Sequence, residues 1–381
     1  MRGQLKLSLL IFFFFSFLGG LAACDRQEEP REKTTVGAAP AAEQKTAAQA
    51  AGPIKVGFLY SGALSAEGEN KAQEEARKAL GDMPGISTVA RGEIPSGEVA
   101  IAAVGEMIDE GCALIVGTSY KLMGSMYEAA RRHPDVQFLH YSGYKLRPNL
   151  SVFDARAYEA AYLTGMVAGS MTSSEIIGYV AAAPVPEVIR SLNAFALGAR
   201  AVNPQAEVRV SWSDSWDNPE QEKRVASALV DIGADVLAQY EESPAVQQAA
   251  EERGVYSVGY YTDMSKFAPK AQLTAVVFHW QAFYSEVLKE MRVGMFKGGI
   301  FWLGMNSGVV DIAPYGPAVP SGVREKVDQR RREIIGGDFK VFKGPLFDQD
   351  GIERIPAGKV ADERDLLGMI WLVEGVVGSA K

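Results

Sequence analysis

Short strand-like segments alternate with helical patterns along most of this chain, and this alternation strongly limits how it can fold. Residues 54–60 read IKVGFLY, residues 113–118 read ALIVGT, and residues 235–240 read DVLAQY. Each segment is apolar over most of its length and leads into a turn. Such alternation predicts an α/β fold in which parallel sheets are covered by helices on both faces.

The predicted elements form two successive runs of α/β units, at 54–156 and 157–279. Strands are predicted at 54–60, 86–89, 113–118, 136–142, 150–153, 176–181, 207–213, 235–240, 256–262 and 273–279. Helices are predicted at 70–80, 98–110, 122–132, 157–171, 187–202, 219–232, 245–253, 281–292 and 323–335, the last capped by Gly336 and exposing Arg330, Arg331 and Arg332. Each run is long enough to be one domain.

Composition excludes several functional classes. The net charge is −8, so we expect no general attraction to nucleic acid. Two cysteines, Cys24 and Cys112, rule out a disulfide scaffold, and three scattered histidines give no metal-ligand spacing. We therefore expect no cofactor and no metal, and interpret Cys112 as a buried packing residue.

Motifs for catalysis are absent from the sequence. It contains no GxSxG, no GxxxxGK[ST] and no CxxC, and its acidic pairs are more typical of solvated surfaces than of an acid–base pair. We predict that the protein is not an enzyme.

The N-terminus has the organisation of a secretory signal. Arg2 and Lys6 precede a nearly continuous apolar run at 7–18, which is too short for a permanent membrane span. The sequence LAAC at 21–24 resembles a bacterial lipobox and implies cleavage after residue 23 and lipidation of Cys24. A plain signal peptide is the alternative. Residues 24–52 would then be the lipidated cysteine and a flexible tether.

Aromatic and acidic side chains gather at the predicted strand ends, where open α/β sheets bind ligands. They are Tyr60, Ser61, Gly62, Thr118, Ser119, Tyr120, Tyr141, 212–216, Tyr240, Glu241, Glu242, 260–263 and Trp280. Two lobes with facing strand ends would enclose a cleft that suits a flat, hydrogen-bonding ligand.

Several long segments, in the same order, resemble the basic membrane lipoprotein (BMP) family of purine-binding ABC-transporter proteins. They include RAYEAAYLTG at 156–165, PVPEVIRSLNAF at 184–195 and GPLFDQDG at 344–351. The resemblance implies a type I periplasmic-binding-protein fold, with two doubly wound parallel-sheet lobes joined by a multi-strand hinge. It implies lobe 1 at 54–156 plus 281–308 and lobe 2 at 157–280 plus 309–378.

The same resemblance implies a function and a location. Together with the lipobox, it implies a monomeric lipoprotein on the periplasmic side of the cell envelope. Asp25, directly after Cys24, resembles the acidic residue that favours retention of enterobacterial lipoproteins at the inner membrane. The protein would close around a nucleobase or nucleoside and deliver it to an ABC permease. A sensor that feeds a membrane receptor, or a surface lipoprotein with another heterocyclic ligand, stays open as an alternative.

The predicted ligand-binding residues combine the strand-end argument with this resemblance. Trp216 matches a purine-stacking position, Asp263 an acidic one, and Tyr120 and Trp280 aromatic ones. The full set is Ser61, Gly62, Glu69, Ser119, Tyr120, Tyr141, Trp216, Tyr240, Glu241, Asp263 and Trp280.

Two segments depart from the family pattern. Ala66 stands where the branch has an Asp and Glu69 where it has an aromatic residue, and YEES at 240–243 replaces HTDS. These changes argue for a ligand other than adenine, such as another nucleobase, a nucleoside, or a heterocycle that carries more donors or a positive charge.

Overall fold

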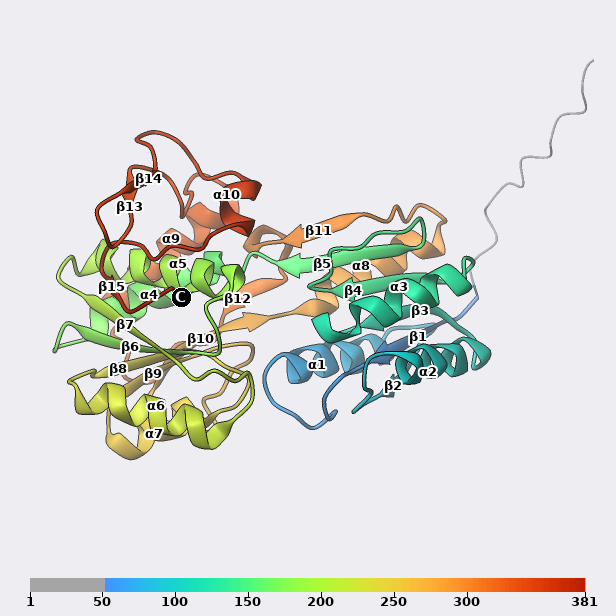
Figure 1. Ribbon diagram of the computed structural model, residues 1–381, viewed down its shortest axis with the longest axis horizontal. Helices are drawn as coiled ribbons and strands as arrows, with labels where there is room; N and C mark the ends of the chain where they lie inside the picture. Colours follow the sequence, from blue (N-terminus) through green and yellow to red (C-terminus); the bar gives the residue numbers. More distant parts are fainter. Residues whose placement is uncertain (1–51, 381) are drawn as a thin grey trace, which may run out of the picture. The chain divides into compact units, whose positions relative to one another are not determined.

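The computed structural model describes residues 52–380. The predicted signal peptide, Cys24 and nearly all of the predicted tether lie outside the described residues. Within this part the chain forms two sheets built mainly of parallel strands, each with helices on both faces (Figure 1). The predicted α/β fold with two parallel-sheet lobes is therefore confirmed.

Lobe 1 is built on a six-stranded parallel sheet of order β11-β5-β4-β3-β1-β2. Its strands are β1 (Ile54–Leu59), β2 (Ile86–Arg91), β3 (Cys112–Gly117), β4 (Gln137–Tyr141), β5 (Leu150–Ala155) and β11 (Ile300–Leu303). Its helices are α1 (Glu69–Gly81), α2 (Glu98–Asp109), α3 (Met123–Arg132) and α8 (Trp280–Arg292). The side chains of β1 alternate between a cluster under α1 and α8 and a second cluster under α2 and α3, so both faces are buried.

Lobe 2 is built on a seven-stranded sheet of order β12-β10-β9-β8-β6-β7-β15, in which only the pairing of β12 with β10 is antiparallel. Its strands are β6 (Ile176–Ala181), β7 (Glu207–Trp212), β8 (Val236–Tyr240), β9 (Tyr256–Gly259), β10 (Gln272–Phe278), β12 (Val310–Ile312) and β15 (Val376–Val377). Its helices are α4 (Tyr158–Met171), α5 (Pro186–Val202), α6 (Pro219–Asp231), α7 (Ala245–Arg253) and α9 (Ser321–Gly336). A separate hairpin, β13 (Leu346–Phe347) with β14 (Glu353–Ile355), and the short α10 (Glu363–Leu367) belong to the C-terminal segment.

The chain passes between the two sheets three times. It leaves lobe 1 after β5, near residue 156, returns after β10 at residue 279, and leaves again after β11 through residues 304–309. We propose that the lobe boundaries inferred from the resemblance lie at these passages.

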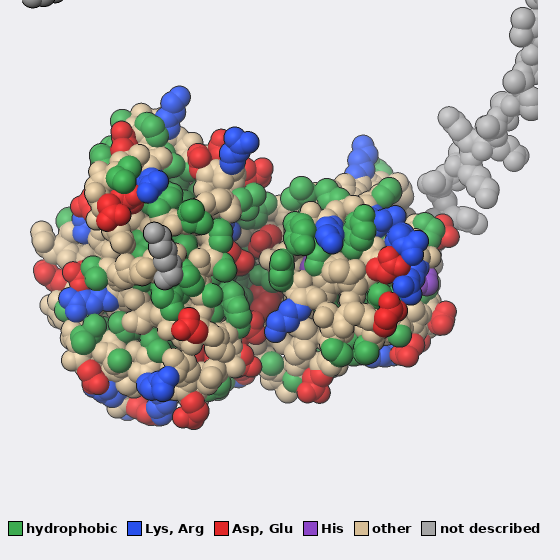
Figure 2. Space-filling view, in the orientation of Figure 1, with side chains coloured by type: hydrophobic (Ala, Val, Ile, Leu, Met, Phe, Trp, Pro, Cys, Tyr) green, Lys and Arg blue, Asp and Glu red, His purple; other side chains and the backbone are tan. Residues whose placement is uncertain are grey.

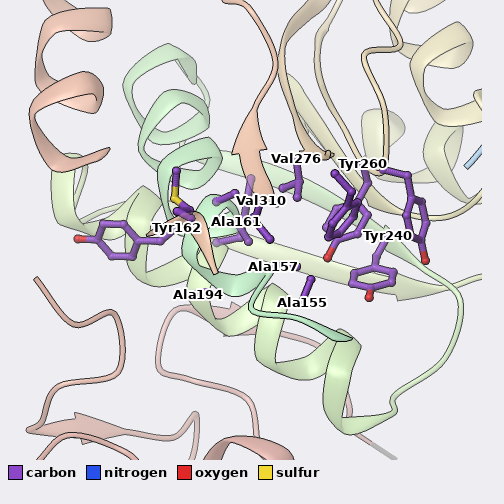
Figure 3. Packing of buried hydrophobic residues seen from close by; sticks show 14 of the residues in the cluster. Ala155, Ala157, Ala161, Tyr162, Ala194, Tyr240, Tyr260, Val276 and Val310 are labelled. Atoms are coloured by element: carbon purple, nitrogen blue, oxygen red, sulfur yellow. The ribbon is translucent and has the colours of Figure 1, made fainter. Parts of the chain in front are cut away.

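Two helices of lobe 2 pack at unusually close range. A Cβ atom on Gly165 of α4 would lie 2.0 Å from the Phe195 carbonyl oxygen of α5. A Cβ atom on Gly198 of α5 would lie 1.9 Å from the Tyr162 carbonyl oxygen of α4. Small residues are therefore required at these two positions. The same core holds Ala155, Ala157, Ala161 and Ala194 beside these helices (Figure 3).

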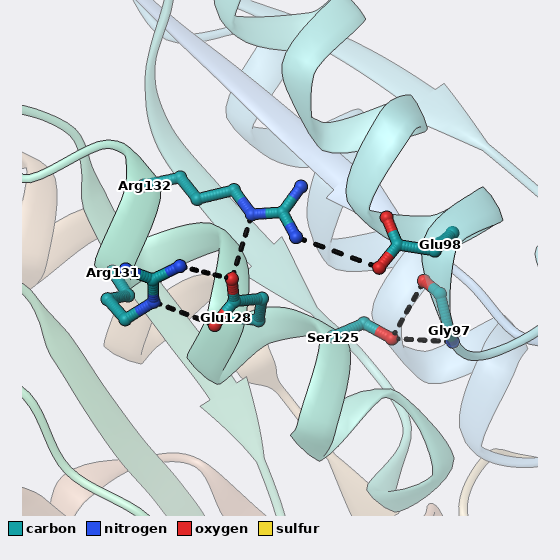
Figure 4. Close-up of polar contacts among 6 residues, drawn as sticks. All are labelled: Gly97, Glu98, Ser125, Glu128, Arg131 and Arg132. Atoms are coloured by element: carbon teal, nitrogen blue, oxygen red, sulfur yellow. Dashed lines mark hydrogen bonds and ion pairs between the residues drawn. The ribbon is translucent and has the colours of Figure 1, made fainter.

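Lobe 1 carries a polar connection between its two outer helices (Figure 4). The Ser125 hydroxyl of α3 accepts a hydrogen bond from the Gly97 backbone nitrogen at 2.8 Å, directly before α2 begins. The guanidinium of Arg132 pairs with Glu128 at 2.8 Å and with Glu98 at 3.6 Å. These contacts fix the start of α2 against α3.

Most predicted elements agree with the structure within two residues, and three details differ. The strand predicted at 256–262 ends at Gly259, because Tyr261 has a φ of 72° and leaves the extended region. Helix α9 is capped by Gly337 (φ 84°) rather than Gly336. The predicted solvated arginine face of α9 holds only for Arg332, which is exposed: Arg330 lies 3.7 Å over the Phe339 ring, and Arg331 pairs with Asp311.

Candidate functional site

A continuous series of aromatic contacts joins the two lobes. We call it the ring chain. Successive ring centroids are 5.8, 5.8, 5.6 and 5.4 Å apart, in the order Tyr240, Tyr261, Phe278, Trp280 and Tyr141. Tyr240 ends β8 of lobe 2, whereas Tyr141 ends β4 of lobe 1. The carboxyl ends of strands from both sheets therefore meet here, which is where α/β sheets place ligands.

Four carboxyl groups lie beside the ring chain, and we call them the acidic cluster. Glu69 begins α1, Asp154 belongs to β5, Glu187 lies in the first turn of α5, and Glu242 follows β8. Each lobe thus contributes two. Figure 2 shows acidic side chains gathered where the two lobes meet.

Glu69 is the most deeply buried member of the acidic cluster, with 5% of its surface exposed. Its Oε1 atom accepts hydrogen bonds from Gln73 Nε2 at 2.7 Å and from the Trp280 indole nitrogen at 3.0 Å. Its Oε2 atom is buried without a hydrogen-bond partner. Burial raises the pKa of Glu69 well above its ordinary value, and the negative charges of Glu242, Glu187 and Asp154 raise it further.

The pKa values of two other members, Asp154 and Glu242, are raised as well. Burial, assisted by the charge of Glu187, raises the pKa of Asp154 to about 7. Burial also raises the pKa of Glu242 to about 7; Asp217 adds to this rise and Lys121 opposes it. Like charges held near one another are costly, so the site favours groups that supply protons or positive charge.

Contacts between the lobes close over this region. The ammonium group of Lys266 in lobe 2 lies 2.8 Å from Glu67 Oε1 in lobe 1. The backbone of Gly68 (φ 69°) approaches Glu242 so closely that a Cβ atom there would lie 2.7 Å from the Glu242 Cα atom. Gly68 precedes α1, so this approach also positions Glu69.

Four of the predicted residues meet in this site. Glu69 belongs to the acidic cluster, and Tyr141, Tyr240 and Trp280 belong to the ring chain. The Tyr240 hydroxyl donates to Glu187, which connects the ring chain to the acidic cluster.

Trp216 and Tyr120, two of the predicted aromatic ligand contacts, have different ring partners. Trp216 is 38% exposed and makes an edge contact with Tyr240 at 6.2 Å. Tyr120 is 59% exposed, and its ring partner is Tyr144 at 6.3 Å. Their joint role in binding stays a prediction.

The remaining predicted residues belong to neither the ring chain nor the acidic cluster. Glu241 is fully buried and accepts from the Ser213 hydroxyl at 2.7 Å, whereas its neighbour Glu242 joins the acidic cluster. Asp263 is exposed and accepts from Gln272 Nε2 at 2.8 Å. Ser61 and Gly62 follow β1, with Gly62 close to Asn70, and Ser119 follows β3.

Sequence reasoning missed Asp154 and Glu187 as site residues. The predicted strand at 150–153 stopped one residue short of Asp154, and β5 reaches Ala155. Glu187 follows Pro186 in the first turn of α5, where an acidic residue is ordinarily explained by the helix dipole alone. Its hydrogen bond with Tyr240 and its electrostatic effect on Glu69 and Asp154 assign it to the site.

Two cavities lie elsewhere, beside the C-terminal segment, and the second is lined by residues from both lobes. One of about 410 Å³ is lined by residues that include Tyr162, Phe339 and Lys340, and one of about 400 Å³ by residues that include Arg156 and Asn306. Among residues 52–380 no helix is long and apolar enough to cross a membrane, and no group of three or more His, Cys, Asp or Glu side chains could hold a metal ion.

Proteins of known structure share this two-lobed arrangement. An ABC transporter solute-binding protein from Conexibacter woesei aligns with a TM-score of 0.67 and 22% identity, over 75% of this chain and 98% of that chain. A transcriptional activator of the comK gene from Bacillus halodurans aligns with a TM-score of 0.68 and 24% identity, over 75% of this chain and 99% of that chain. The fold is therefore that of the type I periplasmic binding proteins.

Sequence comparison identifies the family within this class. The family model described as "ABC transporter substrate-binding protein PnrA-like" matches residues 54–339, and the chain belongs to this family, Bmp. A purine-binding protein of Brucella abortus is 38% identical over 87% of this chain and 95% of its own length. A Haloferax volcanii protein named as an ABC transporter glucose-binding protein is 37% identical over 70% of this chain and 65% of its own length. Members of the family bind substrates for ABC transporters outside the cytoplasm and are not enzymes.

Proposed function

We propose that this protein is a membrane-anchored lipoprotein that captures a purine-like nucleobase or nucleoside between its lobes and delivers it to an ABC permease. The observation that carries the proposal is the buried ring chain, assembled from both lobes beside carboxylates that accept hydrogen bonds. Flat rings bind aromatic faces, and the N–H groups of a base suit carboxylate acceptors. The purine-binding relative from B. abortus supports the same ligand class.

Capture would work through closure of the lobes. The residues of the site come from both sheets, so a ligand that contacts both favours the closed arrangement over the open one. The pairing of Lys266 with Glu67 and the close approach of Gly68 to Glu242 would form as the lobes close.

The test is direct binding of a panel of nucleobases and nucleosides to folded, ligand-free protein, by calorimetry and thermal shift. A binder raises the melting temperature by mass action. Tyr261→Ala should weaken binding about tenfold or more, whereas Tyr256→Ala, at the opposite end of β9, should leave it unchanged. A panel without any binder would refute the purine-like ligand.

A sugar is a second candidate ligand, because the H. volcanii relative is named as glucose-binding. Carboxylates also accept hydrogen bonds from sugar hydroxyls, and aromatic rings also cover sugar faces. The panel therefore includes glucose and ribose. Binding of glucose with no response to any purine would replace the first proposal with this one.

A further inference from the structure

We propose that the site between the lobes prefers a positively charged heterocycle, with Glu69 as the counter-charge. This inference rests on the proposed function, because it names the charge state of the ligand that the same site would take. It goes beyond that function by predicting discrimination between ligands of equal size and shape.

The first support is the unpaired oxygen of Glu69. Its Oε1 atom already accepts two hydrogen bonds, from Gln73 and Trp280, and its Oε2 atom has none although the side chain is 5% exposed. A buried carboxylate oxygen without a partner is costly, and a cationic or N–H-rich group removes that cost.

The second support is the excess of negative charge around Glu69. Asp154, Glu187 and Glu242 all act electrostatically on it. The N-termini of α1 and α5, which carry Glu69 and Glu187 in their first turns, together offset about one elementary charge. Ionisation of all four carboxyl groups would therefore exceed the positive potential that these helices provide, and a cation among them would favour their ionised forms.

The basic side chains near the cluster offset it only in part. Arg190 acts on Asp154, but its Nη1 atom donates to the Leu366 carbonyl at 2.9 Å, and its guanidinium lies 5.2 Å from the centre of the Trp302 ring. Lys121, an exposed residue of the short 3-10 helix Tyr120–Leu122 after β3, acts on Glu242. Neither is hydrogen-bonded to the free oxygen of Glu69, which leaves that atom for a ligand.

The third support is the aromatic character of the same site. Tyr141 and Trp280 lie 5.4 Å apart between ring centres, and Trp280 also donates to Glu69. Tyrosine and tryptophan faces attract cations, most strongly in sites that exclude water. Ring faces and a carboxylate together recognise a flat cation better than a flat neutral molecule.

The test compares isomers that differ in charge but not in composition. The base of 1-methyladenosine is cationic near neutral pH, whereas its isomer N6-methyladenosine is neutral. A second pair, 7-methylguanosine (cationic at slightly acid pH, where its N1 keeps its proton) and 1-methylguanosine (neutral), places the methyl group on other edges of the purine and so controls for steric effects. Calorimetry gives the affinity of each for the wild-type protein and for two variants.

We expect the cationic member of at least one pair to bind about tenfold more tightly or better. Glu69→Gln should abolish this preference, because it weakens binding of the cationic isomer about tenfold more than binding of the neutral one. The control is Glu75→Gln, on the solvent side of α1, where the side chain is 61% exposed. Should Glu69→Gln fail to fold, as judged by circular dichroism, Glu242→Gln takes its place.

Three results would overturn the inference. Neutral isomers that bind as tightly as the cations would refute the charge preference and leave the proposed function standing. A preference that persists in Glu69→Gln would refute the role of Glu69. Absence of binding by both pairs and by the whole nucleobase and nucleoside panel would refute the proposed function and this inference together.

Discussion

The indole nitrogen of Trp280 donates to the Glu69 carboxylate at 3.0 Å, and this bond ties a crossing between the lobes to the first residue of α1. Trp280 directly follows the second passage of the chain between the sheets and is fully buried. A movement of the lobes at this passage would shift Trp280. The hydrogen bond would then move the Glu69 carboxylate, which belongs to the acidic cluster.

Trp280→Phe should destabilise the protein by about 1–3 kcal/mol, because it retains a ring but removes the donor to a buried carboxylate. Urea unfolding measures the change. Trp216→Phe is the matched control, and at 38% exposure it should shift the free energy of unfolding by less than about 0.5 kcal/mol. Equal effects of the two substitutions would contradict the assigned role of the bond.

Glu241→Gln should flatten the dependence of stability on pH. Burial raises the pKa of Glu241 from 4.5 to about 9, so the folded protein binds more protons at this residue than the unfolded chain does between these values. The free energy of unfolding must then fall as pH rises through that window. Below this pH window Glu241 is protonated in both the folded and the unfolded state, so it causes no loss of stability there.

Urea unfolding at several pH values across this window measures the slope for the wild-type protein and for Glu241→Gln. The variant should lose less stability toward alkaline pH, because an amide does not ionise. Asp154 and Glu242, whose pKa values are raised to about 7, contribute in the same direction and keep part of the slope. Identical slopes in the two proteins would show that Glu241 does not titrate as described.

Gly68→Ala should lower ligand affinity about tenfold or more. Its φ is 69°, and the added Cβ atom would meet the Glu242 backbone across the contact between the lobes. Gly97→Ala is the matched control: its φ is 93°, it also precedes a helix, and nothing lies within 4 Å of the added atom. The control should lose about 1–2 kcal/mol of stability and keep its affinity. Calorimetry and urea unfolding separate the two effects.

Cys24→Ser tests the proposed lipid anchor, which depends on the sequence alone. The wild-type protein expressed with its own N-terminus should partition into detergent in a phase-separation assay, and the variant should partition into water. More than one acyl chain is needed for stable anchoring. Partitioning of both proteins into water would refute the anchor and leave the binding function intact.

The sequence by itself determined the elements of the fold. Periodicity and strand length depend on neighbours along the chain, so β6 and α7 were predicted with the observed bounds and most others within two residues. It also supplied four members of the site, because aromatic and acidic side chains were visible at strand ends.

Only the tertiary structure decided which of these side chains share one buried site. Glu241 and Glu242 are adjacent in the chain, yet one bonds Ser213 within lobe 2 and the other joins Glu69 from lobe 1. Asp154 and Glu187 lie 33 positions apart in the sequence and meet because β5 and α5 lie on either side of a passage between the sheets. Whether two such side chains come close depends on how the two sheets face each other. Residues that neighbour each of them along the chain do not determine that arrangement, so no short sequence pattern predicts it.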